Sequence, residues 1–151
     1  FSQLTGSTVY LKNEFEQKTG SFKIRGAYYK IKTLTEDERK NGVVAASAGN
    51  HAQGVAFAAK QLGIYSLIVM PEYTPNTKLD AVKELGSEVE LYGSTFDDAY
   101  ARAKEYESSK GLVMIHPFDD SDVGGILRLV DPCSFIGIGG PGASSAAAIV
   151  L

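Results

Sequence analysis

The chain has 151 residues, a formal net charge of −3, and 44% hydrophobic against 22% charged residues. A chain of this length can bury one domain but not two full ones. Its slightly acidic balance offers no basic surface for nucleic acid, and no apolar run approaches the roughly 18 residues that a membrane-spanning helix needs.

Cysteine and histidine are rare, which bears on redox and metal chemistry. The single cysteine, Cys133, cannot form an internal disulfide, so we expect a reducing compartment, the cytoplasm. Cys133 has no evident base partner and is interpreted as a packed small side chain rather than a nucleophile. No Cys/His cluster has the spacing of zinc ligands, so we expect no metal site.

The N-terminal part predicts a short strand over 9–12, where apolar and polar residues alternate. A turn at 19–21 then leads into an amphipathic helix that fades near residue 34. We expect Ser21 to cap its N-terminus. Its apolar face follows the spacing i, i+4, i+7 of Ile24, Tyr28 and Ile31.

Lys23 lies in the first turn of this predicted helix, where the positive end of the helix dipole disfavours a cation. Two interpretations are open. Position alone favours a solvated surface lysine. The alternative is an amine that works uncharged, as a nucleophile toward a carbonyl group.

From residue 42 onward, short apolar runs alternate with amphipathic segments. One short charged turn, which begins with a Thr35–Glu38 capping box and stops at Asn41-Gly42, precedes them. The runs predict strands at 43–47, 66–70, 88–92 (half-exposed) and 112–115, and the segments predict helices at 50–62, 77–85 and 95–109. Repeated strand–helix units imply parallel strands joined by right-handed crossovers. The predicted fold class is therefore α/β, a three-layer domain with a parallel sheet.

Two segments in this order resemble the paired signature of the threonine/serine dehydratases, KTGSFKIRGA at 18–27 and SAGNHAQG at 47–54. These are pyridoxal-phosphate enzymes of fold type II, and the resemblance runs from about residue 8 to 120. It implies that 1–41 begin a large cofactor-binding domain and that 42–117 form the small α/β domain. Residues 118–151 would return to the large domain, incompletely.

The resemblance also implies roles for particular residues. Lys23 would hold pyridoxal 5′-phosphate as a Schiff base and then move the substrate's α-proton. Phe22 would pack beside the cofactor, although a buried phenylalanine on a helix needs no such role. The second segment would bind the substrate carboxylate, and its asparagine, Asn50, would also bond the cofactor's 3′-oxygen. The substrate-binding residues of this segment would be Ser47, Ala48, Gly49, Asn50, His51 and Gln53. For His51, a structural hydrogen bond is the favoured alternative.

Position 48 separates activities within this family. Serine racemase has a second serine there, which exchanges a proton on the opposite face of the substrate. Ala48 cannot do so, and it therefore favours elimination over racemisation.

The C-terminal tail departs from the family pattern. A strand, a Gly-rich loop and an Ala-rich helix are predicted from residue 135 onward, whereas 123–130 has no clear period. The loop resembles the family's phosphate cradle, at Gly139, Gly140, Gly142 and Ala143, although Pro141 lacks an N–H to donate. A turn after a buried strand is the alternative. Against the family pattern the chain is short by about one helix near 121–134, and it starts without methionine, so we expect missing residues or a truncated relative.

The resemblance leads to one main hypothesis and two alternatives. The main hypothesis is a dehydratase, or ammonia-lyase, that acts on the small amino acids L-threonine and L-serine and serves isoleucine biosynthesis. The alternatives are serine racemase or threonine synthase of the same group, and a truncated, non-catalytic α/β binding domain. Full-length family members are expected to be homo-oligomers. No nucleic-acid or membrane partner is expected.

Overall fold

The computed structural model describes residues 3, 6, 8–117 and 147–150 of the chain. In chain order its elements are β1 (Val9–Lys12), the 3-10 helix η1 (Glu14–Glu16), α2 (Lys23–Lys32), α3 (Glu36–Asn41), β2 (Val43–Ala46), α4 (Asn50–Leu62), β3 (Ser66–Met70), α5 (Asn76–Glu84), β4 (Glu88–Leu91), α6 (Phe96–Lys110), β5 (Val113–Met114) and β6 (Ala147–Val150).

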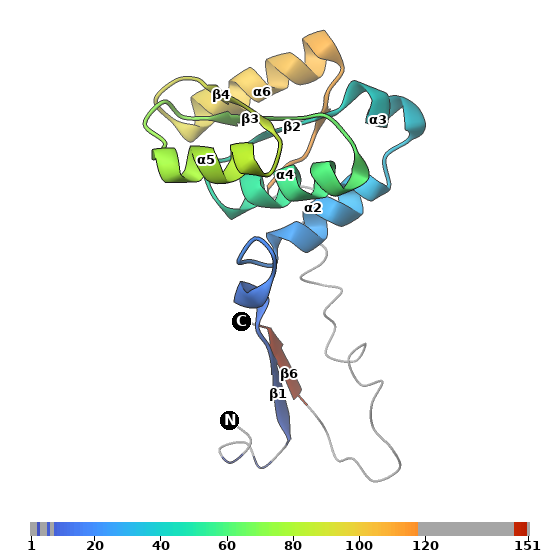
Figure 1. The fold of residues 1–151 in the computed structure, drawn as a ribbon, viewed down its shortest axis with the longest axis vertical. Coiled ribbons are helices and arrows are strands. Elements are labelled where there is room, and N and C mark those ends of the chain that lie inside the picture. The colour runs from blue at the N-terminus through green and yellow to red at the C-terminus, as the bar shows by residue number, and fades with distance from the viewer. Residues whose placement is uncertain (1–2, 4–5, 7, 118–146, 151) are drawn as a thin grey trace.

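Four parallel strands form the central sheet in the order β4-β3-β2-β5. The helices α4 and α5 cover one face, with α2 packed beyond α4, and α6 covers the opposite face (Figure 1). This arrangement confirms the predicted α/β class and its three layers. The edge strand β4 is only half-buried, as its alternating sequence predicts.

The core consists of two apolar clusters, one on each face of the sheet. In β2, Val43 and Ala45 belong to the cluster with α4 and α5, whereas Val44 and Ala46 belong to the cluster with α6. This is the alternation that a strand imposes on its side chains. Because β2 is buried on both faces, it reads in the sequence as a continuous apolar run.

The order of the strands creates a switch point between β2 and β5. The chain runs outward from β2 through α4, β3, α5 and β4, and then returns through α6 to the other side of β2. Right-handed crossovers in opposite directions place their helices on opposite faces. In open α/β sheets, ligands bind outside the carboxyl ends of the strands at such a point.

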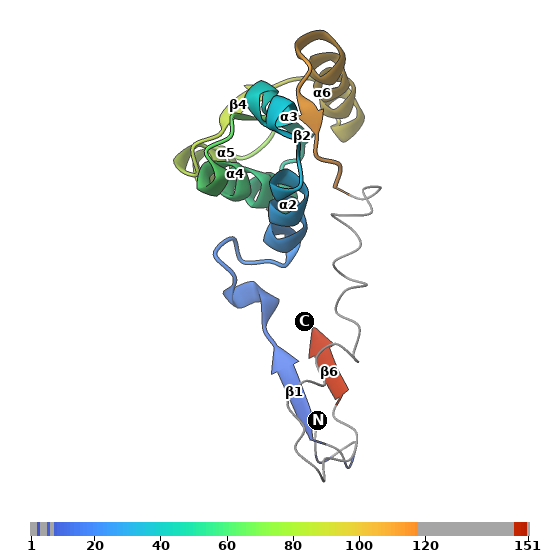
Figure 2. The same ribbon diagram turned by 90° about the vertical axis from the view of Figure 1, so that its right-hand side faces the viewer.

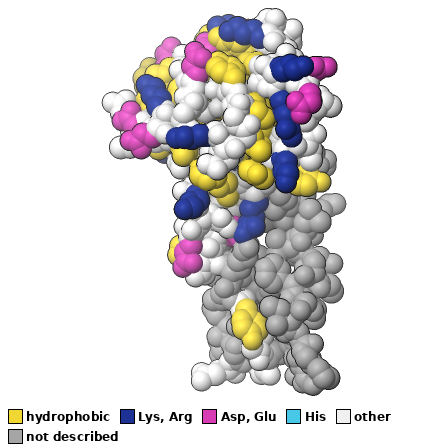
Figure 3. Space-filling view, turned by 45° about the vertical axis from the view of Figure 1, so that its right-hand side comes forward, with side chains coloured by type: hydrophobic (Ala, Val, Ile, Leu, Met, Phe, Trp, Pro, Cys, Tyr) yellow, Lys and Arg dark blue, Asp and Glu magenta, His cyan; other side chains and the backbone are white. Residues whose placement is uncertain are grey.

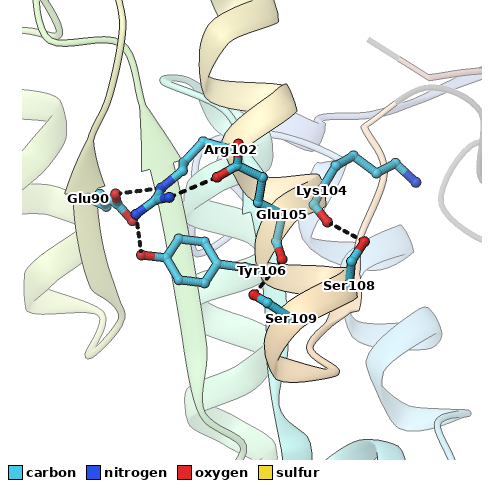
Figure 4. Close-up of polar contacts among 7 residues, drawn as sticks. All are labelled: Glu90, Arg102, Lys104, Glu105, Tyr106, Ser108 and Ser109. Atoms are coloured by element: carbon cyan, nitrogen blue, oxygen red, sulfur yellow. Dashed lines mark hydrogen bonds and ion pairs between the residues drawn. The ribbon is translucent and has the colours of Figure 1, made fainter.

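Side-chain contacts fix the position of α6 on the sheet (Figure 4). The Arg102 guanidinium contacts Glu90 of β4 at 2.9 Å and Glu105 at 2.8 Å. It also donates to the Tyr106 hydroxyl at 3.2 Å and lies over the Tyr92 ring. Elsewhere on the α/β domain, Lys and Arg side chains are interspersed with Asp and Glu on the face shown in Figure 3.

Two predictions about α2 are wrong. Its N-cap is Phe22, not Ser21, and within the described residues the buried Ser21 hydroxyl makes no hydrogen bond to a backbone N–H of the helix. Tyr28 is not on the buried face. The helix instead buries Ile24, Ala27 and Ile31, because its contact with α4 follows the spacing i, i+3, i+7 and leaves Tyr28 37% exposed.

The tail also differs from its prediction. Residues 147–150 form β6, not part of an Ala-rich helix, and β6 pairs in parallel with β1 in a separate two-stranded sheet (Figure 2). Backbone pairing with β1 satisfies the N–H and C=O groups that a helix would have bonded internally. The strand predicted from residue 135, the Gly-rich loop at 139–143 and the segment 121–134 lie outside the described residues.

Candidate active site

Lys23 is the first residue of α2, and its side chain reaches the segment that follows strand β5. The amine Nζ donates a hydrogen bond to the carbonyl oxygen of Pro117 at 2.7 Å. Nζ also lies 5.6 Å from the centre of the Phe22 ring. The side chain is half-buried, and burial lowers the pKa of its amine from the ordinary value of 10.5. Lys23 therefore lies at the switch point and not on an open helix surface.

The segment before α2 is fixed to the helix by an ion pair. Arg25 Nε lies 2.9 Å from a carboxylate oxygen of Glu14, whose side chain is almost fully buried. Glu14 belongs to η1 and Arg25 to α2, so this ion pair links the two helices on either side of the turn that precedes Phe22 and Lys23. Breaking a buried pair leaves an uncompensated charge, which makes such a contact a strong constraint on local geometry.

The predicted substrate loop follows β2, on the neighbouring strand of the switch point. Ser47 extends the ladder through its N–H, which donates to Val69 O at 3.1 Å. Its hydroxyl accepts the Gly49 N–H at 3.2 Å. No side chain caps α4 at Gly49, so the first-turn N–H groups remain suited to an anion. Asn50 is exposed, and Gln53 lies half-buried in the same turn.

His51 is buried on α4 and supports the interpretation of a structural hydrogen-bonding residue. Its Nε2 lies 2.8 Å from the carbonyl oxygen of Ile115. Pro117, whose carbonyl oxygen accepts a hydrogen bond from the Lys23 amine, follows Ile115 by two residues. His51 therefore holds the segment after β5 from the side of α4.

Sequence reasoning missed three features of this region. Pro117 received no role, because the sequence does not show that β5 lies beside β2. The hydroxyls of Thr19 and Ser21 are buried just before α2 and have no hydrogen-bond partner within the described part of the chain. Gly54 was part of the second segment without an assigned function.

The described residues fit an anionic, aldehyde-bearing cofactor. A half-buried amine of lowered pKa, an aromatic ring beside it and uncapped helix N–H groups supply a nucleophile, a packing surface and anion donors. The buried hydroxyls of Thr19 and Ser21 add polar atoms for which the described residues provide no bond. The predicted phosphate residues Gly139, Gly140, Gly142 and Ala143 lie outside the described residues.

The described residues contain neither a cluster of metal ligands nor a membrane-spanning helix. Among them, no three His, Cys, Asp or Glu side chains gather as metal ligands. No helix in this part of the chain is long and apolar enough to cross a membrane.

Comparison with known proteins identifies the class. The family model described as pyridoxal-phosphate dependent enzyme matches residues 1–128. The chain belongs to this family.

Relatives of this chain within the family include L-threonine ammonia-lyases and L-threonine dehydratases. It is 57% identical to L-threonine ammonia-lyase of Thermotoga maritima over 81% of this chain and 30% of that protein. It is 44% identical to the biosynthetic L-threonine dehydratase of Pasteurella multocida over 99% of this chain and 31% of that protein. Each alignment therefore spans under one third of the relative's length.

Solved structures give the same picture of the fold. Threonine deaminase isoform 2 of Solanum lycopersicum aligns with a TM-score of 0.75 and 45% identity, over 87% of this chain and 38% of that one. Serine racemase of Dictyostelium discoideum aligns with a TM-score of 0.73 and 38% identity, over 81% of this chain and 40% of that one.

Proposed function

We propose that the complete protein is a pyridoxal-phosphate-dependent L-threonine/L-serine dehydratase. The observation that carries the proposal is the Lys23 amine, half-buried at the switch point and 2.7 Å from Pro117 O, in a chain of this family. The reaction removes water from the substrate and then adds water back as ammonia leaves. L-threonine gives 2-oxobutanoate and ammonia, and L-serine gives pyruvate and ammonia. The similarity to biosynthetic dehydratases supports a place in isoleucine biosynthesis.

Lys23 and its neighbours would hold the cofactor and move the proton. When bound, the cofactor supplies an electron-withdrawing ring that stabilises negative charge at the substrate's α-carbon. The Lys23 amine would bind the cofactor aldehyde and, once released from it, would take the α-proton. A lowered pKa favours the uncharged amine that both roles need. Phe22 would pack beside the cofactor, and Asn50 would donate a hydrogen bond to its 3′-oxygen. The assignment of phosphate binding to Gly139, Gly140, Gly142 and Ala143 rests on the sequence resemblance.

The loop after β2 would bind the amino-acid substrate. Its N–H groups at the start of α4 suit a carboxylate, and the Ser47 hydroxyl holds the turn by accepting the Gly49 N–H. Gln53 assists from the same turn. His51 contributes through its position rather than as a ligand, because its ring is directed to Ile115 O.

Ala48 favours a lyase over a racemase. It has no hydroxyl to exchange a proton on the opposite face of the substrate, whereas serine racemase has a serine there. Equilibration of D- and L-serine as fast as elimination would contradict this assignment.

The wider organisation of the protein is also proposed. Residues 1–41 and 118–151 belong to a large cofactor-binding domain, and 42–117 form the small domain. Support comes from the separate β1–β6 sheet beside the four-stranded one. We further propose a homo-oligomer in the cytoplasm, the latter on the absence of any cysteine besides Cys133 in the sequence.

The test compares Lys23→Ala with Lys32→Ala in the complete protein. Both lysines lie on α2, but Lys32 is exposed in its last turn. Lys23→Ala should abolish 2-oxobutanoate formation from L-threonine and the pyridoxyl label left on the protein by borohydride, whereas Lys32→Ala should keep both. Full activity of Lys23→Ala, or an inactive unmodified protein loaded with cofactor, would refute the proposal.

A further inference from the structure

Gly54 of α4 lies against the backbone of Lys23. A Cβ atom at position 54 would lie 3.1 Å from the carbonyl carbon of Lys23, 3.2 Å from its oxygen and 3.1 Å from the nitrogen of Ile24. These neighbours are backbone atoms, which cannot rotate away as the end of a side chain can. Glycine therefore permits this close approach of α4 to the first turn of α2.

The backbone of α4 does not itself require glycine at this position. Gly54 is inside the helix and is not among the glycines with positive φ. Alanine in a helix interior is favoured over glycine by about 1 kcal/mol. Glycine at position 54 consequently permits the contact between α4 and α2, at the expense of a lower helix propensity in α4.

We propose that Gly54 is a positioning residue that sets the place of the Lys23 amine by letting α4 pack on the Lys23 backbone. Gly54 is one helical turn beyond Asn50, so this contact also ties the position of Lys23 to the loop at the start of α4. The inference deepens the proposed function and rests on it for the catalytic meaning of Lys23.

The experiment compares Gly54→Ala with Gly63→Ala in the complete protein. Gly63 ends the same helix in the left-handed region (φ 67°), and a Cβ there meets nothing within 4 Å. Gly63→Ala thus strains α4 without touching α2. Two reaction rates of Lys23 are measured as a function of pH. The first is the rate of its acetylation by acetic anhydride, which needs no cofactor. The second is the rate at which borohydride traps added pyridoxal phosphate on it. Mass spectrometry of the Lys23 peptide gives both.

Gly54→Ala should remain folded and slow the trapping of pyridoxal phosphate about tenfold, since small misplacements of a reacting group are costly. It should also shift the pH profile of Lys23 acetylation. Gly63→Ala should change neither, although it lowers stability. An unchanged Lys23 in folded Gly54→Ala, or an equal loss in Gly63→Ala, would overturn the proposal.

A measurement on the unmodified protein decides the case if Gly54→Ala does not fold. The contact requires a nuclear Overhauser effect between the Gly54 α-protons and the Ile24 amide proton, and its absence would overturn the proposal. Failure of the dehydratase assignment is separately visible. In that case the acetylation profile would still respond to Gly54→Ala, while the unmodified protein would form no 2-oxobutanoate.

Discussion

The ring of His51 and the carbonyl of Ile115 are joined by a 2.8 Å contact across 64 residues of sequence. The contact links α4 to the end of β5. Two residues later, the Pro117 carbonyl accepts the amine of Lys23 from α2. Three elements that are distant in the chain therefore meet at one short segment, 115–117.

Replacing His51 should weaken both the fold and the site. His51→Leu leaves the fully buried Ile115 carbonyl without this donor, which should cost about 1–3 kcal/mol of unfolding free energy. His51→Gln keeps an N–H donor and should cost less. Urea unfolding measures both variants, and equal stability of the two would contradict the structural role.

The Lys23 amine should lose its proton at a lower pH in the folded protein than in the protein unfolded by urea. Burial lowers its pKa, because the ammonium form is the one that loses solvation. Over the pH interval between the two midpoints the unfolded chain binds more protons, so stability should rise with pH there. Competitive acetylation of Lys23 across pH, with and without urea, measures both midpoints. A folded midpoint at or above the unfolded one would disprove the shift.

Gly42 and Gly63 should respond differently to alanine, although both have positive φ. At Gly42 (φ 94°) a Cβ would lie 2.8 Å from the Tyr65 carbonyl oxygen, which is fixed in the sheet. At Gly63 it meets nothing within 4 Å. Gly63→Ala should cost about 1 kcal/mol, from backbone strain alone. Gly42→Ala should cost more than about 3 kcal/mol. Similar losses for both, measured by denaturant unfolding, would show that the Tyr65 contact relaxes freely.

The N-terminus of α6 should be sensitive to acid. Thr95 and Asp98 form a reciprocal capping box, in which the Thr95 hydroxyl and the N–H groups of Thr95 and Ser94 hold the pKa of Asp98 below its ordinary value of 3.8. The resulting stabilisation is present above the unfolded-state pKa and is lost as the pH falls through the folded-state pKa. Carboxyl NMR titration should show the lowered pKa, and Asp98→Asn should flatten the loss of stability in acid.

The cap itself has a matched control. Thr95→Ala removes the hydroxyl that accepts the Asp98 N–H and should cost about 1 kcal/mol, whereas Thr95→Ser should be nearly neutral. A loss in Thr95→Ser as large as in Thr95→Ala would point to packing of the methyl group instead.

Local patterns predicted most of the α/β domain. The apolar run at Val43–Ala46 and the Thr35–Glu38 box are confirmed because each depends on neighbours in the sequence. The box at Thr95 was missed, although Asp98 three residues later was its signal. Pairing of β6 with β1 depends on a partner at the other end of the chain, so the alanine-rich composition of 147–150 indicated the wrong element.

The candidate site was only partly predictable for the same reason. Lys23 and the loop from Ser47 to Asn50 were found through the resemblance of two short segments. The acceptor at Pro117 depends on strand order, which no local pattern contains. The outward-facing Tyr28 shows that helical spacing alone cannot locate the helix face that a neighbouring helix covers.

Strand order also determines when the Lys23 environment can form during folding. The amine and its acceptor are separated by 94 residues, and β5 is the last strand of the central sheet along the chain. Contacts of such separation form late, because loop closure is unfavourable until the intervening elements are in place. On the ribosome, a nascent chain that has emerged only through α6 can pack α2 on α4 but has no Pro117 to receive the amine. Lys23 therefore acquires its acceptor only after the chain through Pro117 is synthesised and β5 docks beside β2.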